Sequence, residues 1–152
     1  MSVPVEVSLQ TVQTELVAAA EYAAAAGLDL DTGCLSEHSL AFFIRFGNRD
    51  GEQFYAEFHC EEYPLYPPTV EFVNKSRSER GTLRLYPQGF HPTPCICMRY
   101  NRKAYGDRGG PHGDWRMLDW RLPTGNGIAI DTLALMVSDL HSKIRQSSGR
   151  MG

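Results

Sequence analysis

The sequence contains no apolar run that approaches the length needed to cross a lipid bilayer, so we expect no membrane among its partners. Its first ten residues, MSVPVEVSLQ, lack the basic and apolar regions of a secretory signal peptide, which predicts a cytoplasmic protein. The chain also lacks a large excess of charge of either sign: 15 Lys and Arg against 18 Asp and Glu give a formal net charge of -3. This balance does not indicate a nucleic-acid binder.

Cysteine is sparse, with four residues in 152: Cys34, Cys60, Cys95 and Cys97. In a chain without an export signal the compartment keeps thiols reduced, so we expect four free thiols. A nucleotide-binding glycine turn is missing as well. The glycines of GDRGGPHG precede no strand-to-helix turn of the kind that cradles phosphate. We therefore expect no cofactor.

A helix is predicted at each end of a single domain spanning 1–152. Residues 8–27 repeat apolar side chains at helical spacing, with an N-cap candidate at Ser8 and a stop at Gly27. Residues 126–144 form a second apolar face, which predicts a long helix near 128–145. Residues 146–152 are polar and small, so we expect a frayed tail.

Between the helices the hydrophobic period changes to that of strands. Residues 39–46 and 52–60 are rich in aromatic side chains and flank GNRDG, which suits a hairpin turn. Residues 69–74 alternate as a third strand, and 81–87 predict a fourth. The fold class is therefore α+β with an antiparallel meander. Residues 88–124 look irregular, and long irregular stretches in compact domains are often functional.

The stiffest segment is YPLYPP, whose prolines fix the backbone just before the third predicted strand. A His-Pro pair, a cysteine in ICM, two tryptophans and the last helix follow it. This order, over roughly residues 8–145, resembles the ubiquitin-conjugating enzyme fold family. It is nearest to the divergent bacterial members found in ubiquitin-like conjugation and CBASS-type antiphage operons. The residues that carry the resemblance are Tyr63, Pro64, Pro67, Pro68, His91, Pro92, Cys97 and Trp115 or Trp120.

The resemblance implies a ubiquitin-conjugating-like fold with an active-site loop and with the family's C-terminal helices truncated. It also implies a cysteine acyltransferase that holds the C-terminal glycine of a partner protein as a thioester and passes it to an amine. The implied partners are that modifier or substrate protein and an activating enzyme or a CD-NTase-type protein. Two departures stand out: Thr93 replaces the Asn of the family's His-Pro-Asn, and CMRY lacks its acidic residue. They leave open a rival function, an inactive member that serves as a binding scaffold.

The resemblance places Cys97 in the catalytic position; the alternative is a buried structural thiol. Cys95 lies two residues earlier, on the same side of an extended backbone, and is the second candidate nucleophile, a resolving thiol or a spectator. The two thiols, together with His91 and His112, are enough ligands for a tetrahedral zinc site. Cys-x-Cys is not the usual metal-binding spacing, however, so we expect no metal.

Three residues are candidates to replace the missing Asn: Thr93, Asn101 and His112. His112 is favoured, because a histidine titrates near neutral pH and the adjacent glycines allow a close backbone approach. We expect His91 to hold the loop by hydrogen bonding. We expect structural roles for the remaining candidates: His59 and Cys60 as strand-end residues, and Trp115 and Trp120 as lids or core anchors.

The segment 99–121, here called the flap, contains six basic and three acidic residues, a local charge of +3 in a chain of -3. One interpretation is a solvated loop. The other is a surface that steers an acidic partner or a carboxylate tail and keeps the Cys97 thiol ionised.

Overall fold

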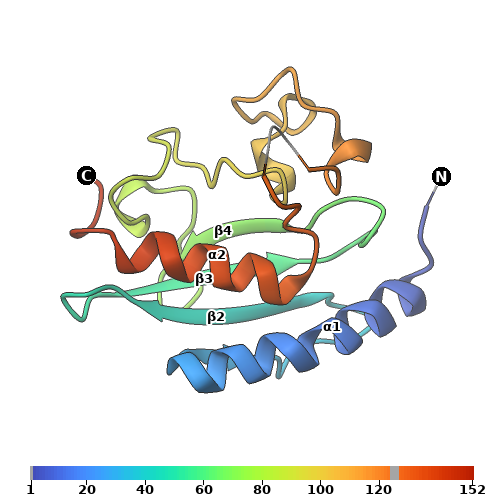
Figure 1. Cartoon of the computed structure of the whole chain (residues 1–152), viewed down its shortest axis with the longest axis horizontal. Helices are drawn as coiled ribbons and strands as arrows, with labels where there is room; N and C mark the ends of the chain where they lie inside the picture. The colour runs from blue at the N-terminus through green and yellow to red at the C-terminus, as the bar shows by residue number, and fades with distance from the viewer. Residues whose placement is uncertain (1, 124–126) are drawn as a thin grey trace.

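The structure, a computed structural model, describes residues 2–123 and 127–152. Within them, the α+β class and the antiparallel meander predicted from the sequence are confirmed, because the sheet order is β1-β2-β3-β4 with antiparallel neighbours (Figure 1). The elements are α1 (Val5–Ala26), β1 (Asp29–Asp31), β2 (Ala41–Gly47), β3 (Gln53–His59), β4 (Thr69–Val73), α2 (Leu133–Arg145) and the short 3-10 helices η1 (Leu83–Leu85), η2 (Arg102–Ala104), η3 (Gly106–Arg108) and η4 (Met117–Asp119).

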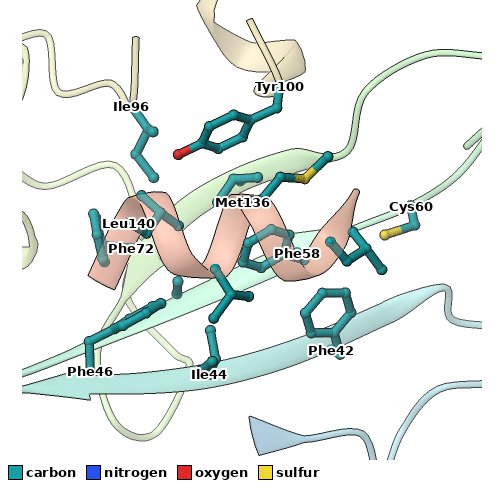
Figure 2. Close-up of a cluster of buried hydrophobic side chains, with 14 of the residues drawn as sticks. Phe42, Ile44, Phe46, Phe58, Cys60, Phe72, Ile96, Tyr100, Met136 and Leu140 are labelled. Carbon is teal, nitrogen blue, oxygen red and sulfur yellow. The ribbon is translucent and has the colours of Figure 1, made fainter. Parts of the chain in front are cut away.

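Both helices pack on one face of the sheet, and the main core lies between them and the strands. Phe42, Ile44 and Phe46 alternate along β2 and are buried beneath α2, as Figure 2 shows. Met136 and Leu140 meet them from the helix. Burial of each such side chain contributes about 1.5–3 kcal/mol, so this layer holds the scaffold together. Neither α1 nor α2 combines the length and the hydropathy that a membrane-spanning helix needs.

The identity of the fourth strand was predicted wrongly. The sheet is completed by β1, whose residues pair with Phe43–Arg45 of β2, and residues 81–87 contain η1 instead of a strand. Residues 81–87 do not extend the sheet past β4; an isolated bridge joins Val73 of β4 to Arg80 just before them. The chain then turns at Gly81, where φ is +74°, and Leu85 and Tyr86 are both buried although they are consecutive. The Leu85 and Tyr86 N–H groups donate to the Thr82 and Leu83 carbonyls at 3.1 and 3.0 Å, so these backbone groups are used in a local turn instead of a strand ladder.

The helix boundaries also differ from those predicted. Helix α1 begins at Val5, so Ser8 lies inside it and donates its Oγ hydrogen to the Tyr63 carbonyl at 2.7 Å. Gly27 ends the helix in the left-handed conformation, as predicted. Helix α2 begins only at Leu133, after a Thr132 cap. Residues 124–126, where the predicted irregular segment ends and the predicted apolar stretch begins, lie outside the described residues.

The last residues lie against the body of the protein instead of fraying. The Met151 N–H donates to the Tyr86 carbonyl at 2.9 Å, and the Gln88 amide donates to the Arg150 carbonyl at 2.7 Å. Met151 itself is buried. An apolar side chain among small polar residues therefore holds this segment next to η1.

Candidate active site

The proline segment anchors the region around the candidate nucleophile. Tyr63 is fully buried, and its hydroxyl donates to Glu15 of α1 at 2.7 Å. The Trp120 indole N–H donates to the Pro64 carbonyl at 3.2 Å, so the far end of the flap is tied to the same segment. The stiff backbone thus provides carbonyl groups at fixed positions, to which the later irregular chain is bound.

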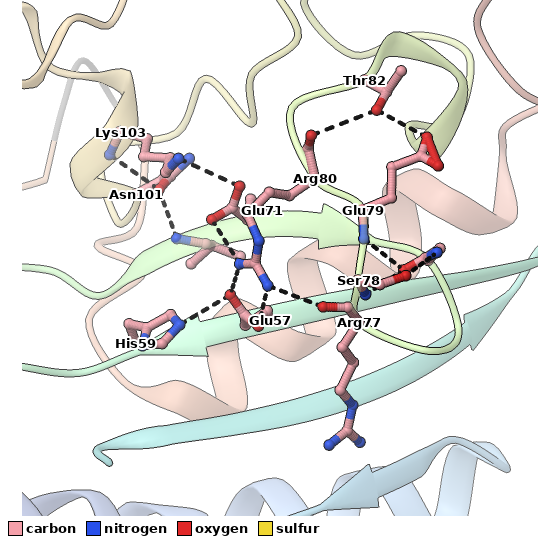
Figure 3. A network of polar contacts seen from close by, with 12 residues as sticks. Glu57, His59, Glu71, Arg77, Ser78, Glu79, Arg80, Thr82, Asn101 and Lys103 are labelled. Atoms are coloured by element: carbon pink, nitrogen blue, oxygen red, sulfur yellow. Dashed lines mark hydrogen bonds and ion pairs between the residues drawn. The ribbon is translucent and has the colours of Figure 1, made fainter. Parts of the chain in front are cut away.

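Asn101 joins β4 to the loop that carries the cysteines. Its Oδ1 accepts the Val70 N–H at 2.9 Å, and its Nδ2 donates to the Ile96 carbonyl at 2.9 Å (Figure 3 includes the first contact). The side chain is completely buried. Both ends of the amide are engaged, so Asn101 is not free to donate to a reacting oxygen, and that candidate role is corrected to one of positioning.

Arg102, a flap residue, extends this attachment. Its backbone N–H donates to the Pro68 carbonyl at 2.9 Å and its Nε to the Pro67 carbonyl at 3.0 Å, while the guanidinium also contacts the Glu61 carbonyl. One of the six flap cations is therefore occupied in holding the proline segment. It is not available to stabilise a thiolate.

Cys97 is half-buried and lies where two cavities meet. The first, of about 360 Å³, is also lined by Phe90, His91 and Lys143. The second, of about 270 Å³, is lined by Arg99, by Trp115 and by mainly apolar residues of the flap and of residues 122–123 and 128–130. Met98 borders both, so the thiol is approachable from two sides of the loop.

Cys95 is buried, and its backbone N–H donates to the His91 carbonyl at 3.0 Å. Burial, with a smaller effect of the neighbouring Cys97, raises the pKa of Cys95 to about 12. Burial also raises the pKa of Cys97, although the Cys95 thiol counteracts part of this effect. Both groups are therefore neutral thiols in the resting protein near neutral pH.

Burial raises the pKa of Cys97 and the Cys95 thiol lowers it in part, so the electropositive setting expected for an ionised thiol does not show in its pKa, although Arg99 lines the second cavity with it. Several flap cations have partners within the protein. Besides Arg102, the Arg116 side chain lies 3.6 Å from Asp119, and the Arg99 guanidinium lies over the Trp115 ring at 4.8 Å. Part of the positive charge of the flap is therefore engaged in contacts within the protein.

His112 lies in the folded part of the flap. Its ring stacks on Trp115 with the ring centroids 3.7 Å apart, and its backbone N–H donates to the Ala104 carbonyl at 3.0 Å. The predicted close approach next to it is present at Gly110, where an added Cβ would come within 2.2 Å of the Lys103 carbonyl oxygen. His112 does not line either cavity that Cys97 borders.

His91, by contrast, lines the first cavity with Cys97. Its Nδ1 accepts the Thr93 N–H at 3.3 Å and lies 3.0 Å from the Thr93 hydroxyl. An accepting Nδ1 places the proton of the neutral ring on Nε2. The expected loop-holding hydrogen bond of His91 is therefore present. It is the His91 imidazole, and not the His112 imidazole, that shares a cavity with the Cys97 thiol. Thr93 is engaged with His91.

The remaining aromatic and strand-end candidates have packing contacts. Trp120 is buried in the core, as expected of an anchor, whereas Trp115 is half-buried and forms a wall of the second cavity. Cys60 is fully buried, and the His59 ring contacts Glu57 at 2.9 Å (Figure 3). Glu57 and Glu71 are themselves buried and share Arg80, which makes this cluster an ion-pair network of the sheet.

Nowhere in residues 2–123 and 127–152 do three His, Cys, Asp or Glu side chains come together in a group that could hold a metal ion. The zinc alternative built on Cys95, Cys97, His91 and His112 thus has no ligand set there. Two residues that line the Cys97 cavity were missed from the sequence, Lys143 and Gln146. They come from the end of α2, and no local motif connects them with the cysteine loop.

The chain matches no protein-family model and no curated protein.

Proposed function

We propose that the protein is a ubiquitin-conjugating-like cysteine acyltransferase that holds the C-terminus of a partner protein as a thioester on Cys97. The observation that carries the proposal is the position of Cys97, half-exposed between two cavities on a loop fixed by Asn101 and the proline segment. Two approaches to one thiol suit a transferase, since an acyl donor and an amine acceptor must reach the same sulfur in turn.

The proposed reaction has two steps. In the first, the Cys97 thiol loses its proton and attacks the carbonyl of an activated C-terminal glycine; the donor's thiolate leaves and takes up a proton. In the second, an amine attacks the Cys97 thioester, an amide bond forms, the amine loses a proton and the Cys97 thiol is regenerated. Because the thiol is neutral at rest, the first step needs a base. His91 borders the Cys97 cavity and acts, in this proposal, in the other tautomer, whose Nδ1–H donates to the Thr93 hydroxyl and leaves Nε2 to accept the proton.

Stabilisation of the tetrahedral oxyanion is assigned to the backbone. Asn101 is engaged, and Thr93 bonds to His91. The Cys97 N–H has no hydrogen-bond acceptor among the described residues. Backbone N–H groups next to a nucleophile can donate to the developing oxyanion, so this group replaces the missing Asn amide in the proposal.

A peptide thioester tests the proposal without an activating enzyme. The parent protein is the Cys34→Ser variant, because Cys34 is exposed and would react nonspecifically. Incubation with a glycine-ending peptide as its mercaptoethanesulfonate thioester should give an adduct on Cys97 that dithiothreitol removes. A further Cys97→Ser change should abolish the reducible adduct, whereas Cys95→Ser should keep it. Mass spectrometry of intact protein and peptides provides the readout.

The second candidate function is an inactive binding scaffold, which the raised pKa of Cys97 and the engaged Asn101 amide favour. A reducible adduct that survives Cys97→Ser and disappears in Cys95→Ser would move the nucleophile to Cys95. No adduct on either cysteine, under conditions in which the urea-unfolded protein reacts, would reject the transferase and leave the scaffold.

A further inference from the structure

A second groove lies at one end of the molecule, where α1 ends, the β2–β3 turn protrudes and α2 finishes (Figure 1). Two overlapping cavities of about 840 and 330 Å³ form it, and both are lined by Tyr22, Arg49, His141 and Arg145. None of these residues has a part in the proposed acyl transfer. We call this region the Arg49–Arg145 groove.

Charge in the groove is of one sign. Neither Arg49 nor Arg145 forms an ion pair or a side-chain hydrogen bond with another described residue, in contrast to the paired Arg80 and Arg84. The described lining of the two cavities includes no Asp or Glu. In a chain with a net charge of -3, two unneutralised guanidinium groups in one groove form a local reversal of sign.

Asn48 adds a neutral hydrogen-bond donor. Its Nδ2 is buried and has no hydrogen-bond partner among the described residues, and the residue is only 8% exposed. The opposite assignment of the amide is ruled out, because Oδ1 already accepts the N–H groups of Asp50 and Glu52, each at 2.9 Å. A buried donor without an acceptor is costly, and a bound oxyanion would supply the missing acceptor.

His141 and Tyr22 form a rigid wall of the groove. The Tyr22 hydroxyl and His141 Nδ1 are hydrogen-bonded at 2.8 Å, and the imidazole stacks near Phe46. Burial, followed by the charge of Arg145, lowers the pKa of His141. The ring is therefore neutral at neutral pH, and the two arginines supply the charge.

The C-terminal ends of α1, at Ala25 and Ala26, and of α2, at Arg145, both border the groove and contribute negative partial charge. Each helix end corresponds to about half an elementary charge, so together they offset about half of the two full positive charges, and the groove remains positive. Guanidinium groups match the oxygens of a phosphate through paired N–H donors. We propose that the Arg49–Arg145 groove binds a phosphate group, either as free phosphate or as the monoester of a small molecule.

NMR titration of the ¹⁵N-labelled protein with inorganic phosphate, at constant ionic strength set with NaCl, tests the proposal. The expected result is saturable shifts of the Asn48 side-chain amide and of the Nε–H signals of Arg49 and Arg145. Arg49→Gln and Arg145→Gln should each raise the Kd at least tenfold. Arg116→Gln, which removes the same charge from the flap, should leave the Kd unchanged.

A parallel titration with adenosine monophosphate distinguishes the two sources. Tighter binding than that of phosphate identifies a monoester, and equal binding identifies free phosphate. The proposal is overturned if the shifts do not saturate, if they are equally large at Arg116, or if the two groove variants, with spectra that show an intact fold, bind as the wild type does. Because these readouts do not involve acyl transfer, they stand apart from the test of Cys97.

Discussion

The Tyr63 hydroxyl and the Leu133 backbone N–H donate to the same atom, Oε1 of Glu15, at 2.7 and 2.9 Å. One carboxylate of α1 therefore joins the proline segment to the first turn of α2. The second contact also satisfies an N–H group that a helix start leaves without an intrahelical partner, and it places negative charge at the positive end of the helix.

Loss of this carboxylate should destabilise the fold. Glu15→Ala leaves the buried Tyr63 hydroxyl and the Leu133 N–H without their acceptor, so we expect the free energy of unfolding to fall by about 1–3 kcal/mol. Tyr63→Phe, which removes one of the two hydrogen bonds, should cost less. Glu21→Ala, on an exposed part of α1, should change stability by at most about 0.5 kcal/mol. Urea denaturation measures all three, and equal losses in the Glu15 and Glu21 variants would contradict the finding.

The two thiols of the Cys-x-Cys pair should react in a fixed order. Iodoacetamide should label the half-buried Cys97 before the buried Cys95, because the reagent needs both access and a thiolate. Burial raises the pKa of Cys97, so its labelling rate should keep rising at pH values where the thiols of the urea-unfolded protein, with an ordinary pKa of about 8.5, level off. Peptide mapping by mass spectrometry gives both results. A plateau for Cys97 below that of the unfolded protein would show that its pKa is lowered instead.

Acid should weaken the ion-pair network of the sheet. Burial alone would raise the pKa of Glu57, but the hydrogen bonds from Arg80 and His59 outweigh it and hold the pKa below its ordinary value. The stabilisation is then present above the unfolded pKa of about 4.3 and is lost as pH falls through the folded value. Glu57→Gln should cost about 1–3 kcal/mol at neutral pH, a difference that shrinks below about pH 4.

Denaturation of the wild type and of Glu57→Gln across this pH range measures the difference. The exposed Glu37 provides a control, and Glu37→Gln should differ little from the wild type at any of these pH values. A Glu57→Gln difference that stays constant, or grows, toward low pH would show that the carboxylate is not held in its charged form.

Substitution of His91 and of His112 should slow acyl transfer to different extents. Since His91 shares a cavity with Cys97 and His112 does not, His91→Gln should slow loading from the peptide thioester by about 100-fold, the lower end for a general base. His112→Gln should have a smaller effect, mediated by its stacking on Trp115. Single-turnover kinetics with both variants decides, and a larger loss in His112→Gln would restore the role that the sequence favours for it.

The parts of the fold that the sequence predicts are those in which burial follows a regular period. Phe42, Ile44 and Phe46 alternate and form β2. Strand β1 carries no such signal, because two of its three residues are Asp, a residue depleted in strands. Residues 81–87 show a false signal, since Leu83 and Leu85 alternate while the buried Tyr86 interrupts the pattern.

At the candidate site, local motifs indicate Cys97 but not its surroundings. Asn101 is a plausible donor in the sequence, but in the structure its Nδ2 donates to the Ile96 carbonyl and its Oδ1 accepts from Val70, 31 residues earlier. Lys143 and Gln146 reach the Cys97 cavity because α2 lies across the sheet. Such contacts depend on tertiary packing, so they cannot be read from the spacing around the cysteine.

The attachment of the cysteine loop to β4 also sets an order for folding. Asn101 binds the Val70 N–H, and Arg102 binds the Pro67 and Pro68 carbonyls, so these attachments of the loop cannot form until the end of β4 is in place. Contacts between distant segments are costly to close and form after local ones. We therefore expect the sheet to assemble first and the nucleophile to be fixed last, so that the amides of the Cys97 loop exchange with solvent more readily than those of β2 and β3.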